Sequence, residues 1–331
     1  MQRPDARPDA VRSQREAYGA TLCDIADEEP RLLVLDGDLA NSTKADIFAE
    51  RHPSRFIQMG IAEQNLVAVA AGLATEGFIP VVNTFASFIA YRALDQVRVV
   101  VAQPRLNVKL AGSYSGLLTG RTGKTHQCFD DLAIMRNLPG MVVLAPADDV
   151  ETAGALRAAV EHVGPVYIRL TRDPAARLKG SAGRFQIGPA IPLRAGRDAT
   201  LFSTGQQTVR SLEAARLLAE RDISIAVVHL PTLKPFDVTT VVDALSLTPL
   251  AVTAEEHAVT GGLGGLIAET LTDRRPMPLL RLGIDDTWGE SAPNEALLER
   301  HGLDAAQMAK AIEAFVRLHR QPISPSRQEG A

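Results

Sequence analysis

The feature that most constrains the fold is a regular alternation of short β-branched runs with longer helical patterns. Strands that alternate with helices predict a mostly parallel sheet that is covered by helices on both faces. The strand candidates are 32–35, 80–82, 107–110, 141–144, 166–170, 199–202, 223–228, 250–253 and 279–282. The helical patterns fall near 11–28, 62–75, 86–102, 130–137, 148–162, up to 220, 237–245, from 265 and from 304.

The alternation is interrupted once, and this divides the chain into two parts. Residues 176–195 are rich in Gly, Pro, Arg and Lys and have weak periodicity, so we expect a linker with room for one short strand. Two mostly parallel α/β domains are therefore predicted, one at 11–175 and a smaller one at 196–320. The polar ends at 1–10 and 321–331 predict flexible tails.

The composition indicates a water-soluble globular protein. The chain has 331 residues, of which 46% are apolar and 22% charged, and its net charge is −4. This charge gives no reason to expect nucleic acid or an anionic membrane as a partner. No apolar run reaches the roughly 18–20 residues of a membrane helix. The N-terminus lacks the apolar region of a secretory signal, and two cysteines, Cys23 and Cys128, suggest reduced thiols, so we expect a cytoplasmic protein.

One carboxylate stands at the head of an apolar helical run. Glu63 precedes Leu66 to Ala74, which are apolar on nearly every face, so the helix should be buried rather than amphipathic. Burial raises the pKa of a carboxyl group, and a carboxyl group of this kind in a cleft is typical of acid–base chemistry. An acidic residue at a helix start is also explained by the positive end of the helix dipole. Both explanations stay open on this segment alone.

Polar residues gather where four predicted strands end. These are Asp36 to Ser42, Asn83 to Phe85, a Gly-rich loop at 111–127, and Arg172. Ligands of α/β sheets bind beyond the carboxyl ends of the strands. The four segments together therefore predict a ligand site at one edge of the first sheet.

The Gly-rich loop contains a segment that imitates a nucleotide-binding loop. Residues 120–125 end in Gly-Lys-Thr, but the P-loop pattern needs Gly at the position of Leu118. A loop that covers an active site is the better interpretation. His126 follows in the same loop among polar residues, where it is either a surface histidine or a site residue.

Two other sets of residues have ordinary structural explanations. Phe85, Phe88 and Tyr91 are spaced three apart, which is more typical of a core than of a cofactor pocket. Arginines are mostly solvated and say little individually. Glu255 and Glu256 are adjacent in the second half of the chain, and we expect a solvated pair without a role.

The segment Met59 to Asn65 resembles the pyrimidine-binding domain of transketolase. Further resemblances follow in the same order over residues 11–318, and as a set they are specific. They are Asp-Leu-Ala-x-Ser within 36–42, Thr-Phe-x-x-Phe-x-x-Tyr at 84–91, Gly-x-Thr-His-Gln at 123–127, Leu-Thr-Arg at 170–172, and C-terminal-domain segments at 253–265 and 286–291.

The resemblance implies a site for thiamine diphosphate. Glu63 would hydrogen-bond N1′ of the aminopyrimidine ring and so assist the removal of the C2 proton of the thiazolium. Phe85, Phe88 and Tyr91 would form the aromatic pocket around the pyrimidine ring. Asp38 would also contact the cofactor.

The resemblance also implies a substrate site. His126 would contact the oxygen of the ketose donor and act with Glu63 in catalysis. Arg15, Ser42 and Arg172 match positions that bind a sugar phosphate, and the planar charged fork of arginine suits that group.

The Gly-rich loop departs from the family pattern at two positions. Tyr114 and Thr122 stand where typical transketolases have His and Asp, which bind hydroxyl groups of the donor. A site that hydrogen-bonds a hydroxyl group discriminates strongly, so we expect a changed substrate specificity.

A full transketolase also has a diphosphate-binding domain with a Gly-Asp-Gly motif and an Asn, which hold Mg²⁺ and the diphosphate. This chain contains no Gly-Asp-Gly. We therefore expect the C-terminal subunit of a split transketolase. A separate N-terminal-type subunit would hold Mg²⁺ and the diphosphate in an α2β2 heterotetramer.

Three alternatives remain. The chain could be half of a 1-deoxyxylulose-5-phosphate synthase, but that enzyme carries Asp-Arg-Ala-Gly where residues 113–116 read Ser-Tyr-Ser-Gly. It could be a 2-oxoacid dehydrogenase E1 β subunit, which differs around the catalytic Glu and lacks Gly-x-Thr-His-Gln. It could be a non-catalytic regulatory subunit, but a scaffold needs neither Glu63 nor His126.

Overall fold

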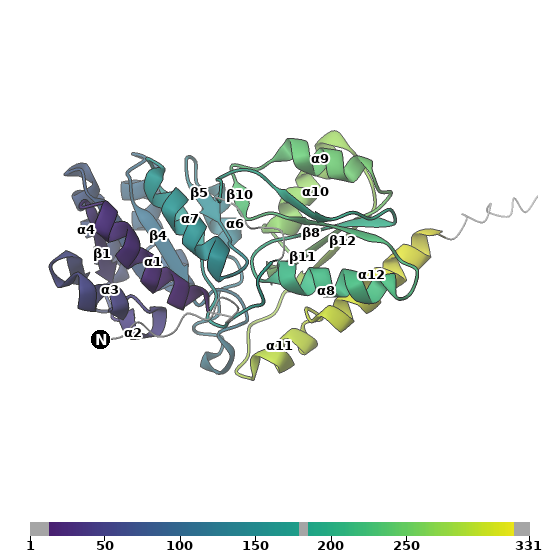
Figure 1. The fold of residues 1–331 in the computed structure, drawn as a ribbon, viewed down its shortest axis with the longest axis horizontal. Helices are drawn as coiled ribbons and strands as arrows, with labels where there is room; N and C mark the ends of the chain where they lie inside the picture. Colours follow the sequence, from purple (N-terminus) through teal and green to yellow (C-terminus); the bar gives the residue numbers. More distant parts are fainter. Residues whose placement is uncertain (1–12, 179–184, 321–331) are drawn as a thin grey trace, which may run out of the picture.

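The computed structural model describes residues 13–178 and 185–320. These form two α/β domains, each built on its own sheet (Figure 1). The tails predicted at 1–10 and 321–331 lie outside the described residues, as does part of the predicted linker. The predicted fold class, two mostly parallel sheets with helices, is confirmed. No helix in the described part of the chain is long and apolar enough to cross a membrane.

The first sheet has seven strands in the order β10-β5-β6-β4-β3-β1-β2. All pairs are parallel except β10 with β5. Most of its central strands are buried along their whole length, which explains their nearly continuous apolar sequences. The strands are β1 Leu32–Asp36, β2 Phe56–Gln58, β3 Ile79–Phe85, β4 Lys109–Ser113, β5 Val142–Leu144, β6 Val166–Arg169 and β10 Thr232–Lys234.

Helices cover both faces of the first sheet. One face packs against α1 Gln14–Glu28, α3 Asp46–Arg51 and α7 Asp149–Glu161. The other packs against α4 Glu63–Thr75, the π-helical turn η3 Val97–Ala102 and α6 Asp131–Asn137. Shorter elements are α2 Ala40–Thr43, η1 Pro53–Arg55, the π-helical turn η2 Phe88–Arg92, α5 Leu94–Gln96 and η4 Gly120–Thr122.

The second sheet has five strands in the order β12-β11-β8-β9-β7, and β7 alone is antiparallel to its neighbour. Helices α9 and α10 lie above it and α8 and α12 below it in Figure 1. Its strands are β7 Ile191–Arg194, β8 Ala199–Ser203, β9 Ile225–His229, β11 Ala251–Ala258 and β12 Leu279–Ile284. Its helices are α8 Gln207–Ala219, α9 Val238–Ser246, α10 Leu263–Arg274, α11 Asn294–Arg300 and α12 Ala305–Arg320.

The two sheets share structure at their junction. Strand β10 follows β9 of the second sheet in the chain, yet it pairs with β5 at the edge of the first. One apolar core continues across the junction, because Val143 of β5, Phe202 of β8 and Leu233 of β10 belong to the same cluster. The two domains are therefore joined by a shared strand pair and by a shared apolar core.

Helix α4 differs from its prediction. Leu66, Val67 and Ala70 are buried against the sheet, but Gln64 and Ala68 are exposed in this chain. The helix is therefore not buried on nearly every face. Its exposed face consists of small and amide side chains. Because none of them is charged, the sequence did not indicate that this face is exposed.

Candidate active site

The carboxyl ends of β1, β3, β4 and β6 meet at one edge of the first sheet, as four parallel neighbours must. Glu63 reaches this edge from the first turn of α4, and only 4% of it is exposed. The preceding chain is fixed there by the hydrogen bond from the Met59 amide to the Asp36 carbonyl, at 2.9 Å. The sequence pattern thus places a buried carboxylate at the predicted ligand edge.

The surroundings of Glu63 are not purely apolar, which corrects the sequence-based expectation. The Arg92 guanidinium donates from Nη1 to Glu63 Oε1 at 2.8 Å. Oε2 accepts no hydrogen bond from any described residue. Arg92 was not predicted as a site residue, since an arginine on a helical pattern is usually solvated.

Three aromatic rings and an imidazole form one cluster beside Glu63. The rings of Phe85 and Tyr114 stack with centroids 4.2 Å apart, and Phe85 lies 5.5 Å from Phe88. The His126 ring lies 5.7 Å from Phe85 and 5.6 Å from Phe88. The structure therefore brings together Phe85, Phe88 and His126, which are separated by a long loop in the sequence.

Tyr91 does not belong to this cluster, although it was expected to. Its hydroxyl donates to Asp130, and burial followed by this hydrogen bond raises the pKa of Tyr91 above its usual range. Its ring makes no ring contact with any other described aromatic residue. The reason is the π-helical turn Phe88–Arg92, because a π-helix is wider than an α-helix and turns residues three apart away from a common face.

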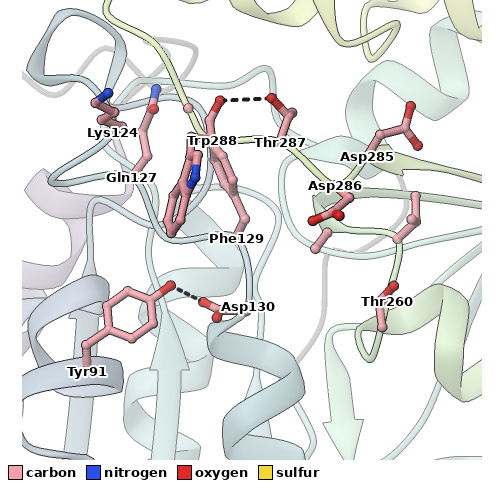
Figure 2. A pocket seen from close by; sticks show the side chains of 13 residues that line it. Tyr91, Lys124, Gln127, Phe129, Asp130, Thr260, Asp285, Asp286, Thr287 and Trp288 are labelled. Atoms are coloured by element: carbon pink, nitrogen blue, oxygen red, sulfur yellow. Dashed lines mark hydrogen bonds between the residues drawn. The ribbon is translucent and has the colours of Figure 1, made fainter.

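Tyr91 instead lines a cavity of about 730 Å³ between the two sheets (Figure 2). Lys124 and Gln127 of the Gly-rich loop line one side. Asp286 and Trp288 approach from the second domain, and the Trp288 side chain is 80% exposed. This cavity adjoins the aromatic cluster through the loop that carries His126.

The predicted anion-binding residues converge on Tyr114. Arg15 Nη1 donates to the Ser42 carbonyl at 3.0 Å and contacts the Tyr114 hydroxyl at 3.3 Å. The Arg172 guanidinium lies 5.6 Å from the centre of the Tyr114 ring. Nε of Arg15 and Nε of Arg172 are both buried without a hydrogen-bond partner among the described residues. Two guanidinium groups with unused donors at one place suit an anionic ligand.

Tyr114 is held in an unusual backbone conformation. Its φ is +57°, in the left-handed region that side chains other than glycine rarely adopt. Its ring is nearly buried between Phe85 and Arg172, and its hydroxyl also lies 3.4 Å from the Ser42 carbonyl. Strain of this kind persists where the surroundings impose it, as they do at functional sites.

Two predicted site residues lie apart from these contacts. Thr122 is exposed, and its hydroxyl donates to the Thr119 carbonyl at 3.0 Å within the loop. The Asp38 side chain is exposed, and its amide donates to Gln58 Oε1 at 3.0 Å. The buried carboxylate of that turn is Asp36, which accepts hydrogen bonds from the amides of residues 39 and 40.

Glu255 and Glu256 are buried, so the prediction of a solvated pair is wrong. Glu256 Oε1 accepts from the Leu118 amide at 3.0 Å, and its Oε2 accepts from Arg210 at 2.7 Å. Glu255 accepts from two amides at the start of α10. Both faces of β11 are covered, so alternation along the strand does not bring either carboxylate to water. The Gly-rich loop is thereby anchored to the second domain.

The motif at 286–291 provides a second anchor for this loop. Gln127 Nε2 donates to the Glu290 carbonyl at 3.1 Å, and Ser291 Oγ donates to the Arg121 carbonyl at 2.7 Å. A Cβ at Gly289 would lie only 1.7 Å from Gln127 Oε1, so only glycine permits this approach. The glycine in this motif is thus explained by packing against the loop.

Among the described residues, no group of three His, Cys, Asp or Glu side chains could hold a metal ion. The arrangement offers instead a buried carboxylate, an aromatic and imidazole cluster, and two guanidinium groups. Such a set can hold a proton on a ring nitrogen, enclose a flat ring and bind an anion.

Comparisons with known proteins agree with this arrangement. The sequence profile "Transketolase, pyrimidine binding domain" matches residues 11–176, and "Transketolase, C-terminal domain" matches residues 188–308. A putative transketolase C-terminal section of Methanocaldococcus jannaschii is 38% identical over 304 residues, which are 91% of this chain and 95% of that protein.

Two further proteins are similar over nearly their whole length. A 6-deoxy-6-sulfo-D-fructose transketolase subunit of Clostridium sp. (strain MSTE9) is 40% identical over 90% of this chain and 92% of its own. A solved structure described as "Split gene transketolase, inactive beta4 tetramer" is 42% identical, with a TM-score of 0.85, and covers 94% of this chain and 100% of its own. The chain therefore belongs to the transketolase family, and its two regions correspond to the pyrimidine-binding and C-terminal domains of that family.

Proposed function

We propose that the chain is the catalytic C-terminal subunit of a split, thiamine-diphosphate-dependent transketolase, which transfers a two-carbon ketol unit between anionic sugars. The observation that carries this proposal is the meeting, at one sheet edge, of buried Glu63, the Phe85–Phe88–His126 cluster and the Arg15–Arg172 pair. The similar proteins named as transketolase sections and subunits support it.

The residues present fit the pyrimidine end of thiamine diphosphate. Bound there, thiamine diphosphate would supply an electron sink for cleaving a bond next to a ketone. The Glu63 carboxyl group would hold a proton toward the ring nitrogen, while Phe85 and Phe88 would flank the ring and exclude water. His126, which is partly exposed at the rim of the cluster, would donate a hydrogen bond to the donor oxygen.

The substrate would be a ketose with an anionic end. The guanidinium groups of Arg15 and Arg172 suit a phosphate or a sulfonate, which are both anionic and tetrahedral, and one similar protein is named for a sulfonated fructose. Tyr114 fills the space between them with its ring and offers one hydroxyl. We propose that Tyr114 and Thr122 change the specificity relative to ordinary transketolases.

The diphosphate end would be held by a separate subunit, which would also supply the Mg²⁺ site, in an α2β2 heterotetramer in the cytoplasm. Two observations support a covering chain. The similar proteins are named as a C-terminal section, a subunit and a split gene product. Next to Glu63, the apolar side chain of Ile61 is 73% exposed, which leaves this side of the candidate site open to a covering chain.

The test is reconstitution with the diphosphate-binding subunit. Ketol transfer should require both chains, and Glu63→Gln should lower kcat by roughly 10²–10⁴-fold while gel filtration shows unchanged assembly. Glu295→Gln is the matched control, because Glu295 also lies in the first turn of a helix but is exposed. Transfer by this chain alone would refute the split-subunit proposal. A near-normal kcat for Glu63→Gln would refute the role of Glu63.

A further inference from the structure

Arg92 makes two contacts that place it at the centre of the candidate site. It ends the π-helical turn Phe88–Arg92, which brings residues four apart nearly into line. Its guanidinium carbon lies 3.7 Å from the centre of the Phe88 ring, and its Nη1 lies 2.8 Å from Glu63 Oε1. A flat, nitrogen-rich group therefore covers an aromatic face and donates to the buried carboxylate.

These are the two contacts that the proposed function assigns to the aminopyrimidine ring. That ring is also flat, would lie against Phe88 and would hydrogen-bond to Glu63. With Arg92 in place only 4% of Glu63 is exposed, whereas 48% of the Arg92 side chain is. Arg92 is thus the outer group, and a ring that approaches Glu63 from solvent would meet it first.

We propose that Arg92 is a latch that competes with the pyrimidine ring for Glu63 and Phe88 and swings toward solvent to admit it. This inference rests on the proposed function. The latch can open, because the half-exposed Arg92 side chain can turn to water while the incoming ring replaces its contact with Glu63. Among the described residues Arg92 has no second carboxylate partner, and Asp95 in the same segment pairs with Arg98 at 3.1 Å.

A latch of this kind lowers the apparent affinity for the cofactor in proportion to the fraction of chains in which it is closed. If about nine chains in ten are closed, its removal should tighten binding by about tenfold. A residue that helps to hold the bound cofactor would have the opposite effect.

The first test measures binding of thiamine diphosphate with Mg²⁺ to the reconstituted complex by titration calorimetry. Arg92→Met keeps the side-chain length without the charge and should bind about tenfold more tightly at unchanged stoichiometry. Arg98→Met, an exposed arginine on the same segment, should bind like the wild type. An unchanged or weaker affinity of Arg92→Met would overturn the latch. Absence of binding by the wild-type complex would overturn the proposed function, and the latch with it.

The second test needs no cofactor and uses the full chain alone. Unfolding free energies of Arg92→Met, Glu63→Gln and the double variant form a double-mutant cycle. Arg92→Met should destabilise the chain that retains Glu63, because a buried carboxylate loses its partner, and should have much less effect in the Glu63→Gln background. Strictly additive effects would show that the two side chains do not interact, and would overturn the latch independently of any assay of activity.

Discussion

Replacement of Arg172 by alanine should separate binding of the anionic end of the substrate from the chemistry. The Arg172 guanidinium makes no hydrogen bond with a described residue, and its buried Nε has only the 4.0 Å ion-pair contact with Asp173. One charge-assisted hydrogen bond contributes about 1.5–3 kcal/mol. Arg172→Ala should therefore lower kcat/KM for an anionic donor by roughly 10- to 150-fold, mostly through KM.

The assay compares D-fructose 6-phosphate with D-fructose as donors in the reconstituted complex. Glycolaldehyde serves as acceptor, so that the donor alone carries the anion. The loss should be confined to the phosphorylated donor, because D-fructose has no charge for Arg172 to bind. Arg172→Lys should recover part of the loss, since it keeps the charge but not the fork.

Arg121→Ala is the matched control, because Arg121 is an exposed arginine in the neighbouring loop. Its kinetics should match those of the wild type for both donors. An equal loss for D-fructose and D-fructose 6-phosphate in Arg172→Ala would refute the reasoning, since it would show that the substitution disturbs the site rather than removing an anion contact.

Three further predictions concern the loop and the buried charges. Tyr114→His with Thr122→Asp should raise kcat/KM for ordinary ketose phosphates, and no change in steady-state kinetics would contradict the specificity proposal. Lys109 is fully buried, and its ammonium donates to three oxygens, so Lys109→Met leaves buried acceptors without a donor and should lower the free energy of unfolding by about 1–3 kcal/mol in urea titrations. Burial lowers the pKa of Lys109 from 10.5 to about 7, so the unfolded chain binds this proton more tightly than the folded chain. The stability of the wild type relative to Lys109→Met should therefore rise from pH 7 to 10. A stability difference that does not change with pH would contradict this. His229→Phe removes the 2.9 Å contact of His229 with Glu151 across the two domains and should destabilise the chain by about 3 kcal/mol, whereas an unchanged urea midpoint would show that the pair contributes nothing.

The parts of the fold that follow from apolar periodicity could be predicted from the sequence. The central strands and the long helices lie close to their expected positions, because burial on both faces imposes apolar runs. Strand β2 was missed because Phe56–Gln58 is short and half-buried, and β10 because Thr232–Lys234 is a short edge strand with polar ends. Helix α11 was missed in the same way, since Asn294–Arg300 follows a proline and has few buried residues.

The part of the candidate site that lies at the carboxyl ends of the parallel strands could be predicted from the sequence. The strand assignment brings the segments of Ser42, Tyr114 and Arg172 to one edge, whereas Arg15, which lies in helix α1, was expected there only from the family resemblance. Arg92 and the true environment of Glu63 could not be predicted, because the π-helical turn changes which side chains share a face. The same turn explains why Tyr91 lies away from the aromatic cluster. The catalytic and binding roles of these residues stay predictions.

The exchange of strand β10 has a consequence for how this chain can be divided. A cut in the stretch 176–195 follows the apparent boundary, yet it would remove the strand that borders β5 and leave that edge of the first sheet unpaired. It would also remove Glu256 and Gly289, which hold the loop carrying His126. A chimera that joins this pyrimidine-binding region to a C-terminal region without these contacts would therefore have an unpaired sheet edge. Its loop at His126 would also lose its contacts with the second domain. The two regions therefore depend on each other for their structure, although each has its own sheet.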